Sequence, residues 1–541
     1  MKNIYLLIST SLLFLAFIFN VAFTPKDAEL TSSIDHQIKE DYKKGLSDFE
    51  GVLIEFISKI NNYEDESATP SVKDEFLKLR LSYKKIEFLC SYLDPEFVDD
   101  YINGPPLPGL ERNAPSLNIL DPEGLQVLEE LVFSENPLEE KENILHYSEL
   151  LQRNFSSFSQ FQKTSQLTTR HIFEAVRMQL VRVFNLGITG FDSPVALNSL
   201  PEAAVSLDAS YVAVKKYFPV IKGLGNDMAE EIDGKYVGAI KYLHEHNDFD
   251  SFDRLYFLKE YINPLYKIIL QAHLALGIET IYEVAPSNQK FPVNYYAENL
   301  FDKNFLNPFY FTELQEEKYN QKVVDLGRML FFDPVLSSNN QRSCASCHNP
   351  QKGFADGMVK SKAFDHLGTL SRNSPTLINS VYADRYFYDL RTDVLENQIE
   401  HVLVGKKEFH TSYIEIFNKL NLSEEYVHAF NEAFPEIKGK NAIMKHTMSA
   451  ALSAYIISLS GFDSPFDKYV RNESKSLDTM AIKGFNLFMG KAGCGTCHFA
   501  PVFNGLVPPH YKETESEVLG VPASASKVNP EIDADLGRYK G

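Results

Sequence analysis

The chain has 541 residues, which is too many for one ordinary hydrophobic core, so we expect two or three domains. Hydrophobic residues make up 44% of the chain and charged residues 23%, as is usual for a globular protein. The formal net charge of −20 argues against nucleic acid as a partner and is compatible with a basic protein partner.

The N-terminus has the pattern of an export signal. Lys2 precedes an apolar run over residues 4–23, and polar sequence begins directly after it. We therefore predict that residues 1–24 are a secretory signal peptide. The run is also long enough to span a bilayer, so an uncleaved N-terminal membrane anchor is the alternative.

Residues 34–283 show helical periodicity. Apolar residues recur there at spacings of three and four, as at Leu46, Phe49, Leu53 and Phe56. The pattern predicts an all-helical bundle of long helices. Because this part of the chain carries no cofactor motif, we expect it to be an accessory or docking domain.

The second half contains the same five-residue motif twice, C-x-x-C-H at residues 344–348 and again at residues 494–498. This motif is typical of covalent attachment of c-type haem, in which two thiols bond to the vinyl groups and the histidine binds iron. A redox dithiol or half a zinc site is the alternative for a single motif. Four of the five cysteines lie in the two motifs, which favours two covalently bound haem c groups. The candidate haem-binding residues are Cys344, Cys347, His348, Cys494, Cys497 and His498.

The haem motifs agree with the N-terminal signal, because c-type haem is attached outside the bacterial cytoplasm. We therefore expect the protein in the periplasm, either free or held by an N-terminal anchor. The fifth cysteine, Cys90, lies in an apolar helical context and is expected to be a buried core thiol.

An internal repeat surrounds the two motifs. A helix containing G-x-x-L-F begins at Gly327 before the first motif and at Gly484 before the second. The repeat predicts two tandem cytochrome c-like domains, at residues 306–470 and 471–541. The expected fold is thus mainly α, with an N-terminal helical bundle followed by two haem domains. A glycine on each helix would allow close approach to a neighbouring helix or to the haem.

From about Val324 onward, the chain resembles the dihaem cytochrome c peroxidase family, which includes the methylamine-utilisation haem enzyme that modifies a partner protein. The resemblance rests on four ordered segments besides the second haem motif: L-G-R-M-L-F-F-D-P-x-L-S, C-A-S-C-H-N-P-x-x-G-F-A-D-G, S-R-N-S-P-T-L-I-N and F-Y-D-L-R-x-x-x-L-E-N-Q. It implies a peroxidatic haem at the first motif and an electron-entry haem at the second. The implied partners are hydrogen peroxide and a small electron donor, either a cytochrome c or a cupredoxin, and a homodimer is an open alternative.

The resemblance also implies catalytic residues. Members of the family place a glutamine and a glutamate on the distal side of the peroxidatic haem, and Gln398 and Glu408 stand at those motif positions. A carboxyl group there can take a proton from one peroxide oxygen and return it to the other, as general base and then general acid. An amide can orient the peroxide without titrating. The alternative is that both are ordinary polar residues on a helix and a loop.

Three further residues are assigned through the same resemblance. His366 stands where some members carry a histidine that caps the resting peroxidatic haem, with an ordinary loop histidine as the alternative. Asn373 matches a residue that helps to bind a calcium ion between the domains. Tyr388 takes the place of the family's tryptophan between the haems, since this chain has no Trp.

Two departures from known patterns complete the expectations. The family's methionine ligand of the second haem has no counterpart, because no Met follows His498, so we expect an incomplete domain or a substitute ligand such as His510. In the first half, residues 124–129 resemble the G-x-H-x-x-E helix of imelysin-like domains, with Gln126 in place of the histidine. This resemblance implies an imelysin-like accessory domain at residues 34–283.

The sequence as a whole predicts an exported haem peroxidase that reduces hydrogen peroxide to water. Two other functions stay open: oxidation of a partner protein, as in the methylamine-utilisation relative, and non-catalytic electron transfer between two haems. Glu408 separates catalysis from simple electron transfer, since only the former needs its carboxyl group.

Overall fold

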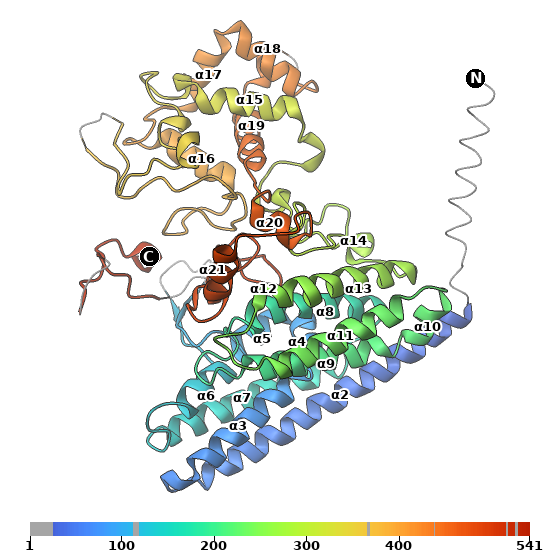
Figure 1. Cartoon of the computed structure of the whole chain (residues 1–541). Helices are drawn as coiled ribbons and strands as arrows, with labels where there is room; N and C mark the ends of the chain where they lie inside the picture. The colour runs from blue at the N-terminus through green and yellow to red at the C-terminus, as the bar shows by residue number, and fades with distance from the viewer. Residues whose placement is uncertain are drawn as a thin grey trace, which may run out of the picture.

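A computed structural model of the chain describes residues 25–111, 118–364, 368–437, 439–514, 518–524 and 529–540. It is mainly helical, as the sequence predicts. A bundle of long helices, blue to green, forms the lower part in Figure 1, and the segments with the two haem motifs form the upper part. The predicted signal segment, residues 1–24, and His366 lie outside the described residues.

Seven longer helices form the body of the bundle: α2 (Pro25–Asn61), α3 (Thr69–Lys84), α7 (Lys141–Gln162), α8 (Thr169–Arg182), α9 (Ser199–Lys215), α11 (Met228–Glu245) and α13 (Asn263–Ala275). Shorter helices connect them: η1 (Glu66–Ala68), α4 (Glu87–Leu93), α5 (Pro95–Tyr101), α6 (Leu125–Val132), α10 (Phe218–Gly223), α12 (Arg254–Phe257) and α14 (Ile281–Val284). The apolar positions that predict α2, namely Leu46, Phe49, Leu53 and Phe56, are all fully buried. Their spacing puts them on one stripe of the helix, which packs against α3 and α7.

Two π-helical turns interrupt the bundle, η2 (Val183–Gly187) after α8 and η3 (Leu258–Ile262) between α12 and α13. Such turns occur often at functional sites. The η2 turn contacts the second haem motif, and α12, which leads into η3, packs against the helix before that motif. Both interruptions therefore lie where the bundle meets the upper part.

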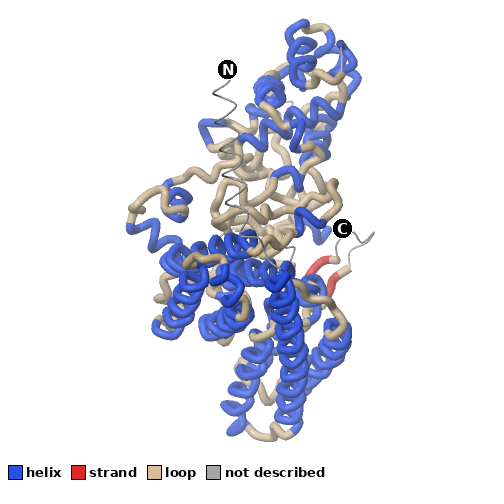
Figure 2. The backbone as a smooth tube through the Cα atoms, turned by 90° about the vertical axis from the view of Figure 1, so that its right-hand side faces the viewer, coloured by secondary structure: helices blue, strands red, loops and turns tan. Residues whose placement is uncertain are grey.

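The sheet formed by the described residues is a two-stranded antiparallel ribbon, β1 (Gly109–Leu110) and β2 (Ile119–Leu120). Figure 2 shows these strands, in red, at the edge of the bundle close to the C-terminal segment. The amide of Val518 donates to the carbonyl of Pro108 at 3.1 Å, which ties the C-terminal segment to the ribbon.

In the upper part, α15 (Gln321–Phe332) packs tightly against α19 (Lys445–Ser458). A Cβ atom at Gly327 would lie 1.8 Å from the carbonyl oxygen of Ala451, so only glycine fits this crossing. The expected close approach is confirmed for the first repeat. Gly484 of the second repeat has no neighbouring atom within 4 Å of the same position, so the two repeats pack differently.

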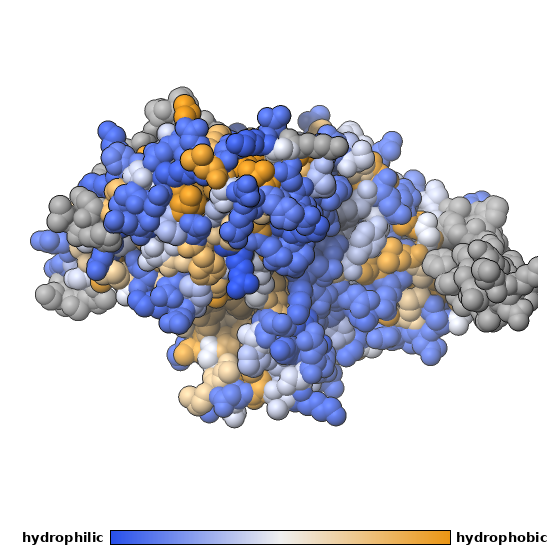
Figure 3. Space-filling view, turned by 90° about the horizontal axis from the view of Figure 1, so that it is seen from above, coloured by the Kyte–Doolittle hydropathy of each residue, from blue (hydrophilic) through white to orange (hydrophobic). Residues whose placement is uncertain are grey.

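The other helices of the upper part are η4 (Pro308–Phe311), η5 (Glu316–Lys318), η6 (Pro334–Leu336), η7 (Cys344–Ser346), η8 (Pro350–Lys352), α16 (Leu395–Val404), α17 (Tyr413–Asn421), α18 (Glu424–Ala433), η9 (Gly439–Ala442), α20 (Pro465–Val470), α21 (Thr479–Met489), η10 (Cys494–Thr496) and η11 (Gly537–Lys540). Seen from above, its surface is mostly hydrophilic, with hydrophobic residues in separate patches and a recess (Figure 3). No helix within the described ranges is long and apolar enough to cross a membrane.

Candidate active site

The two C-x-x-C-H motifs fold in the same way. Each begins with a short 3-10 turn, η7 in the first motif and η10 in the second. In each, the histidine amide donates at 2.9 Å to the carbonyl of the first cysteine, from His348 to Cys344 and from His498 to Cys494. The shared C-x-x-C-H pattern therefore forms the same 3-10 turn twice, as expected for two copies of one attachment site.

The histidine rings are oriented for metal binding. The Nδ1 atom of His348 lies 3.0 Å from the carbonyl oxygen of Phe354, and the Nδ1 atom of His498 lies 3.1 Å from that of Phe503. A histidine that donates its Nδ1 proton to a carbonyl keeps Nε2 free as a ligand. Burial lowers the pKa of His348, which favours the neutral ring that a metal ligand requires.

A cavity of about 1630 Å³ opens beside the first motif. It exceeds the range of about 300–1000 Å³ that is usual for ligand pockets, so it has room for a tetrapyrrole and for space above it. The residues predicted from sequence that line it are Cys344, Cys347, His348, Asn373, Tyr388, Gln398 and Glu408. The thiols, the imidazole and the volume fit covalently attached haem. Burial raises the pKa of the Cys344 thiol to about 12.

Gln398 and Glu408 reach the cavity from one helix and the turn that follows it. Gln398 lies on α16, whose C-cap residue is Gly405, and the amide of Glu408 donates to the carbonyl of Gly405 at 2.9 Å. A Cβ atom at Gly405 would lie 2.5 Å from Oε2 of Glu408. The glycine therefore lets the carboxyl group fold back over the turn.

Two arginines that the sequence interpretation missed act on this carboxyl group through their charge. Burial raises the pKa of Glu408, and the positive charges of Arg391 and Arg342 partly offset that rise. The guanidinium of Arg342 is buried and donates to the carbonyl oxygens of Ala363 at 2.7 Å and Glu408 at 3.4 Å. Arg342 stands two residues before Cys344, and this position next to the motif could have indicated its place in the site.

The C-terminal segment closes one side of the cavity. Residues 533–535 and 537–538, which follow the second motif, line the space beside the first. Arg372 forms a two-bond ion pair with Asp535, at 2.6 and 2.9 Å. Tyr388 is 52% exposed and lies against Gly537, where a Cβ atom would come within 3.0 Å of its ring. Tyr388 thus lies between the first cavity and a segment that follows the second motif.

The bundle contributes to the same cavity. Leu110, Glu111 and Asn118, in and beside the β1–β2 ribbon, line it, and Arg538 donates to the carbonyl of Glu111 at 3.3 Å. These residues carry no motif, and their contact depends on the whole fold. The predicted accessory domain is therefore in direct contact with the cavity of the first motif.

The second motif does not line this cavity, and its Cys497 and His498 side chains are exposed. His510, our suggested substitute ligand, lies instead at the bundle interface, where it bonds the backbone of Ser91 and where burial lowers its pKa to about 4. That placement does not support a ligand role for His510. Within the described part of the chain, no group of three or more His, Cys, Asp and Glu side chains could hold a metal ion, and calcium at Asn373 stays a prediction.

These features are those of a c-type cytochrome with a carboxyl group beside the attachment site. Residues 321–475 match the family model described as di-haem cytochrome c peroxidase, and the C-terminal region of the chain belongs to this family. The cytochrome c551 peroxidase of Pseudomonas aeruginosa is 36% identical over 187 residues, which are 35% of this chain and 53% of that protein. The methylamine utilization protein MauG of Methylorubrum extorquens is 33% identical over 175 residues, 32% of this chain and 48% of MauG.

The chain spans about half the length of the curated relatives that it matches. A solved structure of a MauG-like protein associated with microbial copper homeostasis is 27% identical and covers 44% of this chain and 65% of its own, with a TM-score of 0.34. That superposition is too partial to carry an argument about the fold. The imelysin-like character of residues 34–283 stays a prediction.

Proposed function

We propose that the protein is an exported dihaem c-type cytochrome peroxidase, which reduces hydrogen peroxide to water with electrons from a small cytochrome c or cupredoxin. The observation that supports this most directly is the convergence of the first C-x-x-C-H motif, Gln398 and Glu408 on one cavity. Two electrons and two protons convert each peroxide molecule into two water molecules. When bound, the haem groups supply the redox chemistry, and the chain supplies binding, orientation and proton transfer.

Glu408 is the proposed proton carrier. Its carboxylate accepts the proton of one peroxide oxygen and returns it to the other, so that the second oxygen leaves as water. Because burial raises the pKa of this group above its usual value, the carboxyl group holds a proton more readily than an exposed glutamate would. The positive charges of Arg391 and Arg342 limit that rise.

Gln398 is the proposed orienting group. Its amide can donate to and accept from peroxide without changing charge. Helix α16 carries Gln398, and the turn that follows carries Glu408, so one element sets the separation of the two groups. This arrangement supports a role for both at the distal side of the first haem.

The test is Glu408→Gln in the full haem-loaded protein, with steady-state peroxide reduction measured against a reduced small cytochrome. We expect a loss of about 10²- to 10⁴-fold in kcat, the usual contribution of general acid–base catalysis, with haem content unchanged. Glu400→Gln is the matched control, because Glu400 lies on the same helix but pairs with Lys445 outside the cavity. Full activity in Glu408→Gln would contradict the proposal and favour electron transfer or another oxidisable partner.

A further inference from the structure

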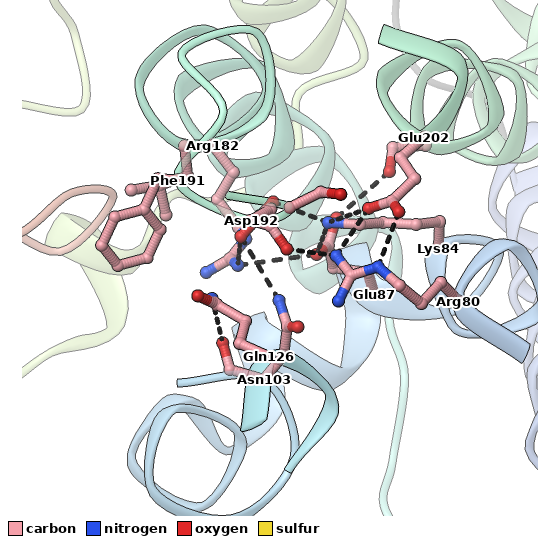
Figure 4. A network of polar contacts seen from close by, with 12 residues as sticks. Arg80, Lys84, Glu87, Asn103, Gln126, Arg182, Phe191, Asp192 and Glu202 are labelled. Atoms are coloured by element: carbon pink, nitrogen blue, oxygen red, sulfur yellow. Dashed lines mark hydrogen bonds and ion pairs between the residues drawn. The ribbon is translucent and has the colours of Figure 1, made fainter. Parts of the chain in front are cut away.

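A cluster of charged side chains lies inside the bundle (Figure 4). Arg80 forms a two-bond ion pair with Glu202, at 2.6 and 2.7 Å, and Lys84 Nζ lies 2.6 Å from both Glu87 and Asp192. The buried members of the cluster are Arg80, Lys84, Glu87, Glu129, Arg182, Asp192 and Glu202. Buried charges are costly unless paired, and a paired network of this kind specifies one arrangement of the surrounding helices.

Gln126 belongs to this cluster as a hydrogen-bonding amide. Its Nε2 atom donates to the carbonyl of Asn103 at 3.3 Å, and the amide of Asn103 donates to Asp192 at the same distance. Gln126, which stands where imelysin-like domains have a histidine, is thus linked to an ion-pair network. We interpret the cluster as a rigid support for the segments that lie next to it in the chain.

Two members of the cluster, Asp192 and Arg182, adjoin segments that contact the loop after the second haem motif. Phe191, next to Asp192 in the chain, packs edge-on against Phe499 with ring centroids 5.7 Å apart. Phe499 directly follows His498. Arg182 is the last residue of α8, and the η2 turn that begins after it supplies the second contact.

That second contact is a closed set of hydrogen bonds. In η2, Asn185 accepts from the amide of Ala500 at 3.1 Å and donates to the hydroxyl of Tyr511 at 3.1 Å. The Tyr511 hydroxyl in turn donates to the carbonyl of Ala500 at 2.8 Å. Both backbone polar groups of Ala500 are therefore satisfied, and the side chains are buried, with 1% of Asn185 and none of Tyr511 exposed.

The contact at Ala500 lies close in the chain to His498, the proposed iron ligand. Ala500 is within the loop whose Phe503 carbonyl accepts from Nδ1 of His498 at 3.1 Å. Such bonds to the second ring nitrogen set the orientation and basicity of a ligating histidine. Fixing Ala500 therefore fixes the segment that orients His498.

We propose that the helical bundle holds the second haem site in place. Asn185, Phe191 and Tyr511 are the positioning residues, and they set the reduction potential of the second haem through the loop that orients His498. The inference rests on the proposed haem attachment at the second motif. It gives residues 34–283 a role in electron entry. Two further contacts strengthen the junction between the bundle and the segment around α21. Asn486 donates to Asp253 at 2.9 Å, and Lys491 donates to Asp250 at 2.7 Å.

The test is Tyr511→Phe in the full haem-loaded chain, because it removes a single oxygen from the hydrogen-bonded set. Haem content, electron paramagnetic resonance spectra and the midpoint potential of each haem are measured on one sample. We expect two haems, an unchanged first haem, and a tenfold change in the ratio of oxidised to reduced second haem at fixed potential, which is about 59 mV for one electron. Tyr236→Phe is the matched control, since its buried hydroxyl bonds Ser210 within the bundle.

Asn185→Ala is the second variant and should shift the same haem in the same direction. Loss of the second haem in either variant, with both haems retained in Tyr236→Phe, would also support the inference. Two haems with unchanged potentials in both variants would overturn it. If the unmodified protein carries no haem at Cys494 and Cys497, the proposed function fails instead, so the two failures are distinguishable.

Discussion

Replacing Gly405 by alanine should disable catalysis without unfolding the protein. The backbone at Gly405 has φ −59° and ψ 117°, which alanine adopts without strain. The added Cβ atom would lie 2.5 Å from Oε2 of Glu408 and 3.0 Å from the carbonyl oxygen of His401. Because the closer atom is the end of a flexible side chain, the carboxyl group moves and the fold remains.

The size of the effect follows from the contact. To reach an ordinary separation of about 3.5 Å, the carboxyl oxygen must move by roughly 1 Å. A misplacement of that size can cost about 100-fold in rate. The free energy of unfolding should fall by no more than about 1–3 kcal/mol, since alanine suits the backbone conformation but its Cβ atom crowds the carbonyl oxygen of His401 at 3.0 Å.

The assay is steady-state peroxide reduction on haem-loaded Gly405→Ala, with thermal unfolding measured on the same sample. Gly234→Ala is the matched control, because its Cβ atom meets no other atom within 4 Å. Wild-type turnover in Gly405→Ala, together with an inactive Glu408→Gln, would show that the carboxyl group does not act from the position described above.

Two further predictions use paired positions. Gly327→Ala should destabilise the upper part by about 1–3 kcal/mol in thermal unfolding, because its Cβ atom would meet the backbone of Ala451, whereas Gly484→Ala in the second repeat should be tolerated. In the pH profile of kcat/KM, the acid limb should lie above the ordinary glutamate pKa of 4.5, since activity is lost as pH falls and Glu408 takes up a proton. Arg391→Gln should move this limb to higher pH by removing a charge that lowers the pKa; an unmoved limb would assign it to another group.

The mainly helical fold and the two candidate haem-attachment motifs were predicted from short-range patterns. The spacing of Leu46, Phe49, Leu53 and Phe56 determines which face of α2 is buried, and C-x-x-C-H is a local turn with local chemistry. Gln398 and Glu408 became candidates only through the family resemblance. Gln398 lies on a helix and Glu408 in the turn after it, so no helical periodicity relates the two positions.

The rest depends on contacts between segments far apart in the chain. Asp535 pairs with Arg372 across 163 residues, and Asn185 bonds Ala500 across 315. Neither pair produces a local sequence pattern, because the two partners come together only in the folded chain. The position of His510 shows the same dependence, since its proximity in sequence to His498 did not reveal its place beside Ser91.

The central claim is that the chain carries two covalent haems and reduces peroxide at the first. The most direct measurement is peroxide consumption by the haem-loaded protein with a reduced small cytochrome as donor, with haem c per chain determined on the same sample. The account predicts two haems per chain and turnover that Glu408→Gln abolishes. Fewer than two haems, or two haems without turnover even after pre-reduction, would contradict it.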